Sequence, residues 1–510
     1  MSAWSLKEGW HTMSSEQTQT NNKANSFSME YFDINLENIN KENISLNPLD
    51  SDYRKLSLVM KHLVGTLVKH GSKSSYEPYL ASNWKTSPDG KTWEFNLRNN
   101  LIASDGSEIT ASTYVKSLKK LALLYKKNKK KVILLPDLIG WDSFNATDDD
   151  LEGLDSVGDS LIRFTFKEKP KGVLQYLSMP YLGFYTSSNF NENGDWADNH
   201  KIVSSNSFEL HEIQSDKIIL KSREWFTISQ HSPKTVRIHF GKKVDLSKLS
   251  SDSNQTIVTS QKVIEPLLES DQFTQIFTSP SQLAFVSLNP SNPLLSNSNN
   301  RVLIRNTIRN IKKEFFNSNP QYIDTDFFYF LHTSDVTNTI ENRDLSNLKG
   351  GELTLLTSKD KNNNFASEMN PIIKKAIESL GVRLNLIYKE DIKNFVETVQ
   401  TGKYDMWLGS VVNGSSIENW VVNMMWCTNM GVSFFDPSNK ICKLTEMYDT
   451  LDNLEIDNKY ISTLNQAIED DATVLPVAVF GDYFYVSNDI SPDGIDHLYS
   501  TIWFDKLKER

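Results

Sequence analysis

Several residue types and patterns that would assign a function are scarce or missing in this chain. Only two of its 510 residues are cysteines, Cys427 and Cys442, with neither Cys-x-x-Cys nor zinc-ligand spacing. A disulfide between them is one interpretation if the chain is exported, and two buried free thiols are the other. No stretch reaches the roughly 18 apolar residues that a membrane-spanning helix needs. The sequence therefore predicts neither a zinc domain nor a transmembrane protein.

The N-terminal residues also lack a targeting pattern. Residues 1–25 contain no basic segment followed by an apolar one, as a secretory signal would, and no cysteine that could carry a lipid anchor. Their polar composition predicts a disordered tail over residues 1–26. We expect folded structure to begin near Phe27.

Catalytic motifs are missing as well. The nine histidines are scattered without His-Glu-x-x-His, and neither Gly-x-Ser-x-Gly nor a glycine-rich phosphate loop occurs. We therefore expect no enzyme, no metal site and no cofactor. The formal net charge of -10 argues against nucleic acid as a partner. A basic run over residues 126–131 is the exception; it fits a solvated helix end, and an acidic partner or lipid surface is the alternative.

The composition that is present describes a globular protein. Apolar residues make up 38% of the chain and charged residues 23%, and 510 residues are enough for two or more domains. Residues 352–411 alternate strand, helix and strand patterns, which predicts a parallel sheet covered by helices.

The most informative stretch runs from Tyr76 to Tyr114. Its Asp89-Gly90 pair lies between apolar alternations, which predicts a β-hairpin, and Thr110 precedes a helical pattern as an N-cap residue. Distinctive pairs and triplets follow in one order: Glu77-Pro78, Leu80-Ala81, Trp84, Asp89-Gly90-Lys91-Thr92, Phe95, Leu97-Arg98 and Ser104-Asp105-Gly106. This order resembles the signature segment of the family 5 (oligopeptide, dipeptide and nickel) solute-binding proteins of ABC importers.

Other landmarks extend the resemblance over roughly residues 40–510. Residues 206–226 are similar to the family's second hairpin, although Asn206-Ser207 stands where the family has Gly-Pro. The resemblance implies an α/β, two-lobe periplasmic-binding-protein-like fold of type II, cluster C, with mixed sheets, flanking helices and crossing hinge strands. The implied division is lobe I over 27–284, with an extra subdomain at about 50–200, lobe II over 285–480, and a return to lobe I over 481–510.

The resemblance also implies a ligand cleft between the lobes. Alignment through Asp405, Gly409 and Trp420 puts Asn413 where peptide-binding members have an aspartate that pairs with the ligand's α-ammonium group. Since a neutral amide compensates that charge less well, we expect that a free peptide N-terminus is not the principal ligand group. For each tryptophan in this region, lobe core is the alternative role. The predicted ligand-binding residues are Tyr53, Trp407, Ser410, Val411, Asn413, Trp420, Phe480 and Tyr483.

The function implied is that of a solute-binding protein which delivers a peptide-like or other small solute to an ABC permease. We expect a bacterial, periplasmic or extracellular monomer. The alternative is a family-derived binding or sensor protein without a dedicated importer, which the missing signal, the absent Gly-Pro and Asn413 favour.

Overall fold

The computed structural model describes most of the chain. The described residues are 11–14, 29–36, 44–50, 56–70, 76–130, 132, 134–145, 151–170, 172–223, 233–240, 256–260, 267, 269, 271–277, 282–318, 323–325, 348–358, 364–390, 392–412, 440–448, 458–480, 483–496, 501–508 and 510. They belong to two compact units. Unit 1 comprises Met1–Ser260, Ile264–Phe277 and Tyr483–Arg510, and unit 2 comprises Gln261–Val263 and Thr278–Asp482.

The predicted hairpin is present in unit 1. Its two strands are antiparallel, and Trp84 lies opposite Phe95. The turn places Gly90 at φ +70°, a conformation that glycine adopts without a Cβ penalty, and Ser87 Oγ accepts from the Thr92 amide. These strands belong to a five-stranded sheet of order β1-β5-β6-β8-β7. Its strands are β1 (His11–Ser14), β5 (Ala81–Thr86), β6 (Thr92–Leu97), β7 (Leu154–Val157) and β8 (Leu161–Thr165).

Strand β1 differs from the prediction for the N-terminus. Residues 1–26 were expected to be disordered, yet His11–Ser14 pair with the edge strand β5, with Met13 opposite Trp84. The reason is the open backbone edge of β5, which accepts an extended segment of any composition.

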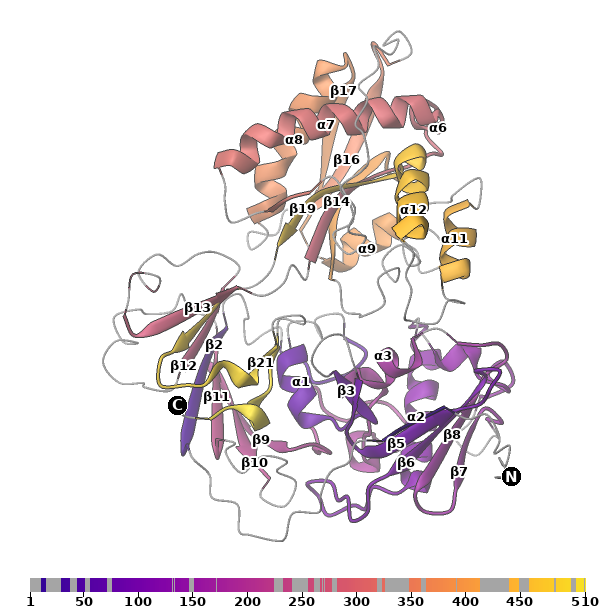
Figure 1. Ribbon diagram of the computed structural model, residues 1–510, viewed down its shortest axis with the longest axis vertical. Coiled ribbons are helices and arrows are strands. Elements are labelled where there is room, and N and C mark those ends of the chain that lie inside the picture. The colour runs from indigo at the N-terminus through magenta and orange to yellow at the C-terminus, as the bar shows by residue number, and fades with distance from the viewer. Residues whose placement is uncertain are drawn as a thin grey trace, which may run out of the picture. The chain divides into compact units, whose positions relative to one another are not determined.

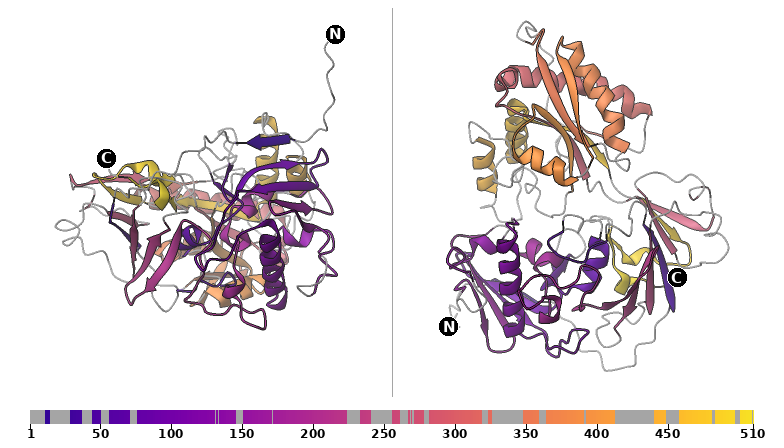
Figure 2. Two further views of the ribbon diagram at one scale, coloured as in Figure 1. Left: turned by 90° about the horizontal axis from the view of Figure 1, so that it is seen from below. Right: turned by 180° about the vertical axis from the view of Figure 1, so that it is seen from behind.

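Helix α2 (Ala111–Lys127) lies along this sheet (Figures 1 and 2). Thr110 caps it as predicted, because the Thr113 amide donates to Thr110 Oγ1 at 3.2 Å. The basic run at its end is partly used inside the fold. Lys126 donates to the carbonyl oxygens of Trp141 and Phe144, both at 2.6 Å.

A seven-stranded mixed sheet forms the rest of the unit 1 framework, in the order β13-β20-β12-β2-β11-β10-β9. The predicted hairpin over 206–226 is confirmed as β9 and β10, which pair antiparallel. The strands are β2 (Tyr31–Leu36), β9 (Phe208–Ile213), β10 (Lys217–Ser222), β11 (Thr235–His239), β12 (Thr256–Ser260), β13 (Phe273–Phe277) and β20 (Tyr483–Ser487).

Helix α1 (Ser57–Leu63) is shorter than the helix predicted over 51–68. It stops at Leu63 because side chains from elsewhere take its last carbonyl oxygens: Ser204 Oγ donates to Leu63 O at 2.7 Å, and Asn206 Nδ2 donates to Lys61 O at 2.6 Å. The chain continues into β3. Short elements complete unit 1: β3 (Val68–His70), β4 (Tyr76–Pro78), η3 (Leu135–Asp137), α3 (Val173–Leu177), η4 (Pro180–Leu182), η5 (Ser187–Asn189), η8 (Pro492–Gly494), β21 (Ile495–Asp496), β22 (Thr501–Ile502) and η9 (Phe504–Lys506).

Unit 2 is built on a six-stranded sheet of order β15-β19-β14-β18-β16-β17. The predicted parallel alternation is confirmed for β16, which runs parallel to β17 and β18, whereas β14 runs antiparallel to β18 and β19. The strands are β14 (Gln282–Leu288), β15 (Ile323–Asp324), β16 (Glu352–Ser358), β17 (Arg383–Lys389), β18 (Met406–Val412) and β19 (Val474–Phe480).

Helices cover both faces of this sheet (Figure 1). One apolar core joins the sheet to α7 and α8, and a second core on the other face joins it to α9, α11 and α12. Because both faces are covered, the central strands are apolar on both sides. The helices are α6 (Pro293–Ser296), α7 (Ser298–Ser318), α8 (Asn364–Ser379), α9 (Ile392–Gln400), α11 (Lys440–Tyr448) and α12 (Asn458–Asp471). Within the described residues, no helix is long and apolar enough to cross a bilayer.

Candidate functional site

Three of the predicted ligand-binding residues lie at one end of three adjacent strands in unit 2. Ser410 on β18 is opposite Ala284 on β14, and Val411 is opposite Leu283. Gln282, one residue before Leu283, is opposite Phe480 on β19. The sheet register therefore gathers Ser410, Val411 and Phe480 within two residue steps of one another, although Phe480 is far from the others in sequence.

Trp407 occupies the core beneath these strand ends. Its side chain is 5% exposed, and its ring meets those of Phe285 and Phe395 edge-on, with centroids 4.9 and 5.8 Å apart. In the part of the chain that the structure describes, its indole Nε1 has no hydrogen-bond partner. Ser410, by contrast, is exposed. In this arrangement Trp407 supports the strand that presents Ser410, and its contact with a ligand stays a prediction.

The start of β18 is fixed by the carboxylate of Asp405. Thr354 donates to Asp405 Oδ2 from both its amide and its hydroxyl, each at 2.8 Å, and Asn292 Nδ2 donates to Oδ1 at 2.8 Å. Three donors on one carboxylate hold the strand to β16 and to the start of α6. The position of Ser410, five residues further along, is thus set by this network and by the Trp407 core.

Tyr483 lies in unit 1, at the first residue of β20. It pairs across the sheet with Ser260 on β12 and Phe277 on β13. Its ring is half-buried and packs against the small core of Val258, Leu267 and Tyr485. Burial, with a smaller contribution from Tyr485, raises the pKa of its phenol, so the hydroxyl stays protonated at neutral pH. It remains a candidate ligand contact.

The other predicted site residues, Tyr53, Asn413 and Trp420, lie outside the described residues. The structure shows the bonding state of one of the two cysteines: Cys442 on α11 is disulfide-bonded. The chain contains one other cysteine, Cys427, which also lies outside the described residues. Of the two interpretations of the cysteines, the disulfide is the one that the structure supports.

A polar network in unit 1 replaces the Gly-Pro that the family resemblance led us to expect. Asn206 is buried, and its amide oxygen accepts from the hydroxyl of Tyr79 in the signature segment. Its amide nitrogen donates to Lys61 O and Val64 O at 2.6 and 3.1 Å, and Arg223 Nη1 donates to Asn206 O at 2.8 Å. The sequence shows the substitution but does not predict this network, since the bonded residues are 17 to 145 positions from Asn206.

Among the described residues, no group of three or more histidine, cysteine, aspartate or glutamate side chains could hold a metal ion. In unit 2, the described part of the candidate site is the set of strand ends that carries Ser410, Val411 and Phe480. Such surfaces recognise small ligands by packing and a few polar contacts.

Comparison with protein families supports the resemblance read from the sequence. The family model described as "Bacterial extracellular solute-binding proteins, family 5 Middle" matches residues 75–305. A Haemophilus influenzae protein named "Putative binding protein" is 33% identical over 79 residues, which are 16% of this chain and 15% of that protein. The alignment thus spans a small part of that relative. The match begins at the signature segment, so the resemblance is confirmed.

Solved structures resemble nearly the whole chain. The periplasmic binding protein DppA of Helicobacter pylori, in complex with the peptide STSA, has a TM-score of 0.72 at 15% identity and covers 94% of this chain and 98% of its own. The Escherichia coli murein tripeptide binding protein MppA has a TM-score of 0.70 at 16% identity, covering 95% and 99%. AgaA of A. tumefaciens R10, in complex with agropinic acid, has a TM-score of 0.69 at 15% identity, covering 94% and 99%. The predicted two-lobe periplasmic-binding-protein fold is confirmed.

Proposed function

We propose that this chain, which matches the family 5 solute-binding proteins over residues 75–305, is the solute-binding component of an ABC importer. The observation that carries the proposal is this family match, because a fold alone hosts many functions. The two-unit fold agrees with it, since structures of binding proteins cover 94–95% of the chain.

The solute class that we propose is peptide-like or another small molecule. The similar structures include complexes with the peptide STSA and with agropinic acid, so the fold accommodates different chemistries. The proposed contacts in this chain are Tyr53, Trp407, Ser410, Val411, Asn413, Trp420, Phe480 and Tyr483. Aromatic and small polar side chains predominate among them, which suits a ligand bound by packing and hydrogen bonds.

The amide side chain of Asn413 restricts the class of solute that we propose. In place of the family's aspartate it offers an amide oxygen, which accepts a hydrogen bond from an amide or hydroxyl but does not neutralise an ammonium group. We therefore propose that the solute does not depend on a free peptide N-terminus. Isothermal calorimetry with unmodified and N-acetylated di- to pentapeptides tests this point. We expect the unmodified and the N-acetylated peptides to bind equally or not at all. Tight binding of the unmodified peptides that N-acetylation abolishes would overturn the proposal.

The same proposal assigns the partners and the location. The protein acts outside the cytoplasmic membrane as a monomer, delivers its solute to a membrane permease, and has no enzymatic activity. The disulfide at Cys442 supports an oxidising location, because disulfides persist outside the reducing cytosol.

Native mass spectrometry of protein purified from its own host tests the function directly. We expect one defined small molecule to leave the protein on activation, and a Ser410→Trp variant to carry less of it, because Ser410 is exposed at the gathered strand ends. Ser298→Trp is the matched control, since Ser298 is exposed at the start of α7. A protein that is always empty contradicts the importer function and favours the sensor alternative. Release from both variants alike contradicts the assignment of Ser410.

A further inference from the structure

The dipeptide Lys-His occurs twice within ten residues of unit 1, at Lys61-His62 in α1 and at Lys69-His70 in β3. The two lysines approach one aromatic ring: their Nζ atoms lie 5.9 and 5.8 Å from the centroid of Trp503. Both imidazoles are buried, with 2% and 5% exposure. Residues 61–70, which run from α1 to β3, therefore hold four basic side chains, and both lysines approach the C-terminal part of the chain.

His62 connects α1 to that C-terminal part. Its Nε2–H donates to the carbonyl oxygen of Ile502 at 2.9 Å. Its ring stacks on Phe504 with a centroid separation of 3.7 Å and an interplanar angle of 11°, and Phe208 meets it edge-on at 5.8 Å. The imidazole is thus packed among aromatic rings and is 2% exposed, so burial disfavours a charge on it.

The C-terminal segment, residues 489–510, has its own hydrogen-bond framework. Strand β21 pairs with β22 in a two-stranded sheet, separate from the seven-stranded one. Trp503 N donates to Gly494 O at 2.7 Å, and Arg510 N donates to Asp489 O at 2.8 Å, so the segment closes on itself. It lies beside α1 in Figure 1, where side-chain contacts such as those of His62 join it to the unit. Such a segment can open without breaking a large sheet.

We propose that His62 is a proton-sensitive latch, whose protonation opens the C-terminal segment from α1 while the sheets of unit 1 remain folded. A charge on the ring must be compensated by its surroundings or expelled into water. Among the described residues, the charged groups that act on His62 are Asp505 of the C-terminal segment, Lys61 of α1 and Lys69 of β3. The two lysines repel a positive ring. Strand β9 contributes the uncharged ring of Phe208.

Asp505 is the one described acid in this set, and it does not bind the imidazole directly. It is 3% exposed, and its Oδ1 finds no hydrogen-bond partner among the described residues. The hydrogen bond of the imidazole goes to the Ile502 carbonyl instead. Burial lowers the pKa of His62 to about 4; Asp505 and the hydrogen bond to Ile502 oppose the shift, and the two lysines add to it. His62 therefore binds a proton weakly while the C-terminal segment is closed, and more strongly when the segment is open.

The second histidine provides an internal comparison. His70 Nε2 lies 3.0 Å from Ser178 Oγ, at the end of α3, and its ring contacts Tyr76. These contacts join His70 to α3 and β4, whereas those of His62 join it to Ile502 and Phe504. Protonation of His70 is expected to loosen α3, whereas protonation of His62 is expected to open the C-terminal segment. The two effects can therefore be distinguished by where protection is lost.

Hydrogen exchange followed by mass spectrometry on the full chain tests the latch. The open segment takes up the proton with the ordinary histidine pKa of about 6.5, and the closed segment with a pKa of about 4. Protection in the C-terminal segment should therefore fall on the order of 40-fold between pH 6.5 and 4.5. Peptides from β10 and β11 should keep their protection over the same range. Protection factors are corrected for the intrinsic pH dependence of exchange.

Two variants decide the outcome. His62→Gln keeps a donor for Ile502 and cannot be protonated, and His62→Phe keeps the stack on Phe504; each should remove most of the pH dependence. His200→Gln is the matched control. Because the His200 side chain is 60% exposed, its replacement should leave the pH dependence of protection unchanged. The proposal is overturned if either folded variant loses protection with acid as the wild type does. It is equally overturned if β10 and β11 lose protection together with the C-terminal segment.

Discussion

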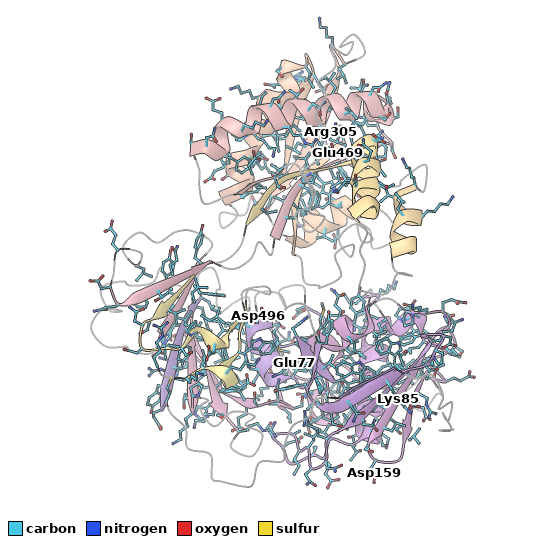
Figure 3. All side chains as sticks on the ribbon, in the orientation of Figure 1. Glu77, Lys85, Asp159, Arg305, Glu469 and Asp496 are labelled. Atoms are coloured by element: carbon cyan, nitrogen blue, oxygen red, sulfur yellow. The ribbon has the colours of Figure 1, made fainter. Side chains whose placement is uncertain are left out.

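Arg309 and Glu469 join two helices of unit 2 through a pair of parallel hydrogen bonds. Arg309 Nη1 donates to Glu469 Oε2 and Nη2 donates to Oε1, both at 2.7 Å, and neither side chain is more than 7% exposed. Arg305, one turn earlier on α7, also pairs with Glu469 at 2.9 Å, and both Arg305 and Glu469 are labelled in Figure 3. The end of α12, and hence the start of β19, is held to α7 by these contacts.

Replacement of Glu469 by glutamine should strongly destabilise unit 2. The change leaves two buried guanidinium groups without their anion, for which about 3–5 kcal/mol is the usual cost of breaking a buried pair. Hydrogen exchange of the α12 amides as a function of urea measures the loss. Glu378→Gln is the matched control, since its pair with Lys374 is exposed and its loss should cost at most about 0.5 kcal/mol. Equal effects of the two changes would contradict the role given to Glu469.

Gly409 should tolerate no side chain. A Cβ at this position would lie 2.2 Å from Trp407 Cζ3, and Trp407 is itself held by Phe285 and Phe395. Gly409→Ala should therefore cost about 1–3 kcal/mol through overpacking. In a Trp407→Leu background the same change should cost much less, because the clashing ring is gone. Urea unfolding of the four proteins in this cycle measures the difference, and an equal cost in both backgrounds is the contrary result.

Much of the fold could be predicted because its signals are local. The hairpin around Gly90, the Thr110 cap and the parallel strands after Glu352 each depend on residues close in sequence, and each is present. The gathering of Ser410 with Phe480 could not be derived from local pattern, since it depends on the register of both strands with β14. Only the family resemblance suggested it.

The length of α1 shows a second reason why a local sequence pattern does not predict every element. Apolar spacing continues to Val68, which favours a longer helix, but Ser204 and Asn206 end it at Leu63 from about 140 residues away. Tertiary hydrogen bonds therefore override a local periodicity. The alternative roles of Trp407, core or ligand wall, were also open from the sequence, because an aromatic residue at a strand end suits both. Its burial against Phe285 shows the core contact, and its contact with a ligand stays a prediction.

Tyr79 and Asn206 should be energetically coupled. The Tyr79 hydroxyl donates to Asn206 Oδ1, while Asn206 Nδ2 satisfies the carbonyl oxygens of Lys61 and Val64. Asn206→Ala should cost about 1–3 kcal/mol because it leaves buried polar groups without partners. Tyr79→Phe removes one of these groups, so the double variant should be less destabilised than the sum of the single ones, with a coupling of about 0.5–3 kcal/mol. Additive costs in a double-mutant cycle would contradict the coupling.

Asp33 should contribute to stability in a pH-dependent way. Burial raises the pKa of its carboxyl, but hydrogen bonds from His239 at 2.7 Å and from Arg237 at 2.8 Å outweigh burial and lower it below the ordinary value of 3.8. The unfolded chain therefore binds this proton more readily than the folded one. The stabilisation is fully present above the unfolded pKa and is lost as the pH falls through the lower folded pKa.

The comparison of wild type with Asp33→Asn isolates this contribution. The wild type should exceed the variant by about 1–3 kcal/mol in free energy of unfolding at pH 7. That difference should shrink as the pH falls below 3.8. Asp216→Asn, at an exposed turn, should differ from the wild type by less than about 0.5 kcal/mol at either pH. Urea unfolding of the wild type and both variants at pH 7 and below pH 3.8 measures these differences in free energy of unfolding. A difference between wild type and Asp33→Asn that grows as the pH falls would contradict the role given to Asp33.

The disulfide at Cys442 should hold α11 against the core that contains Trp407. Cys442 is buried in that core together with Ile441 and Leu464. Reduction removes a crosslink from the unfolded state, and such crosslinks typically contribute about 2–4 kcal/mol. A dithiol reductant should therefore raise hydrogen exchange in α11 of the wild type and have no further effect on Cys442→Ser. Intact mass after alkylation, without reductant, should show no free thiol in protein from an oxidising compartment. Alkylation of both cysteines in that sample would contradict the disulfide and, with it, one support for an exported protein.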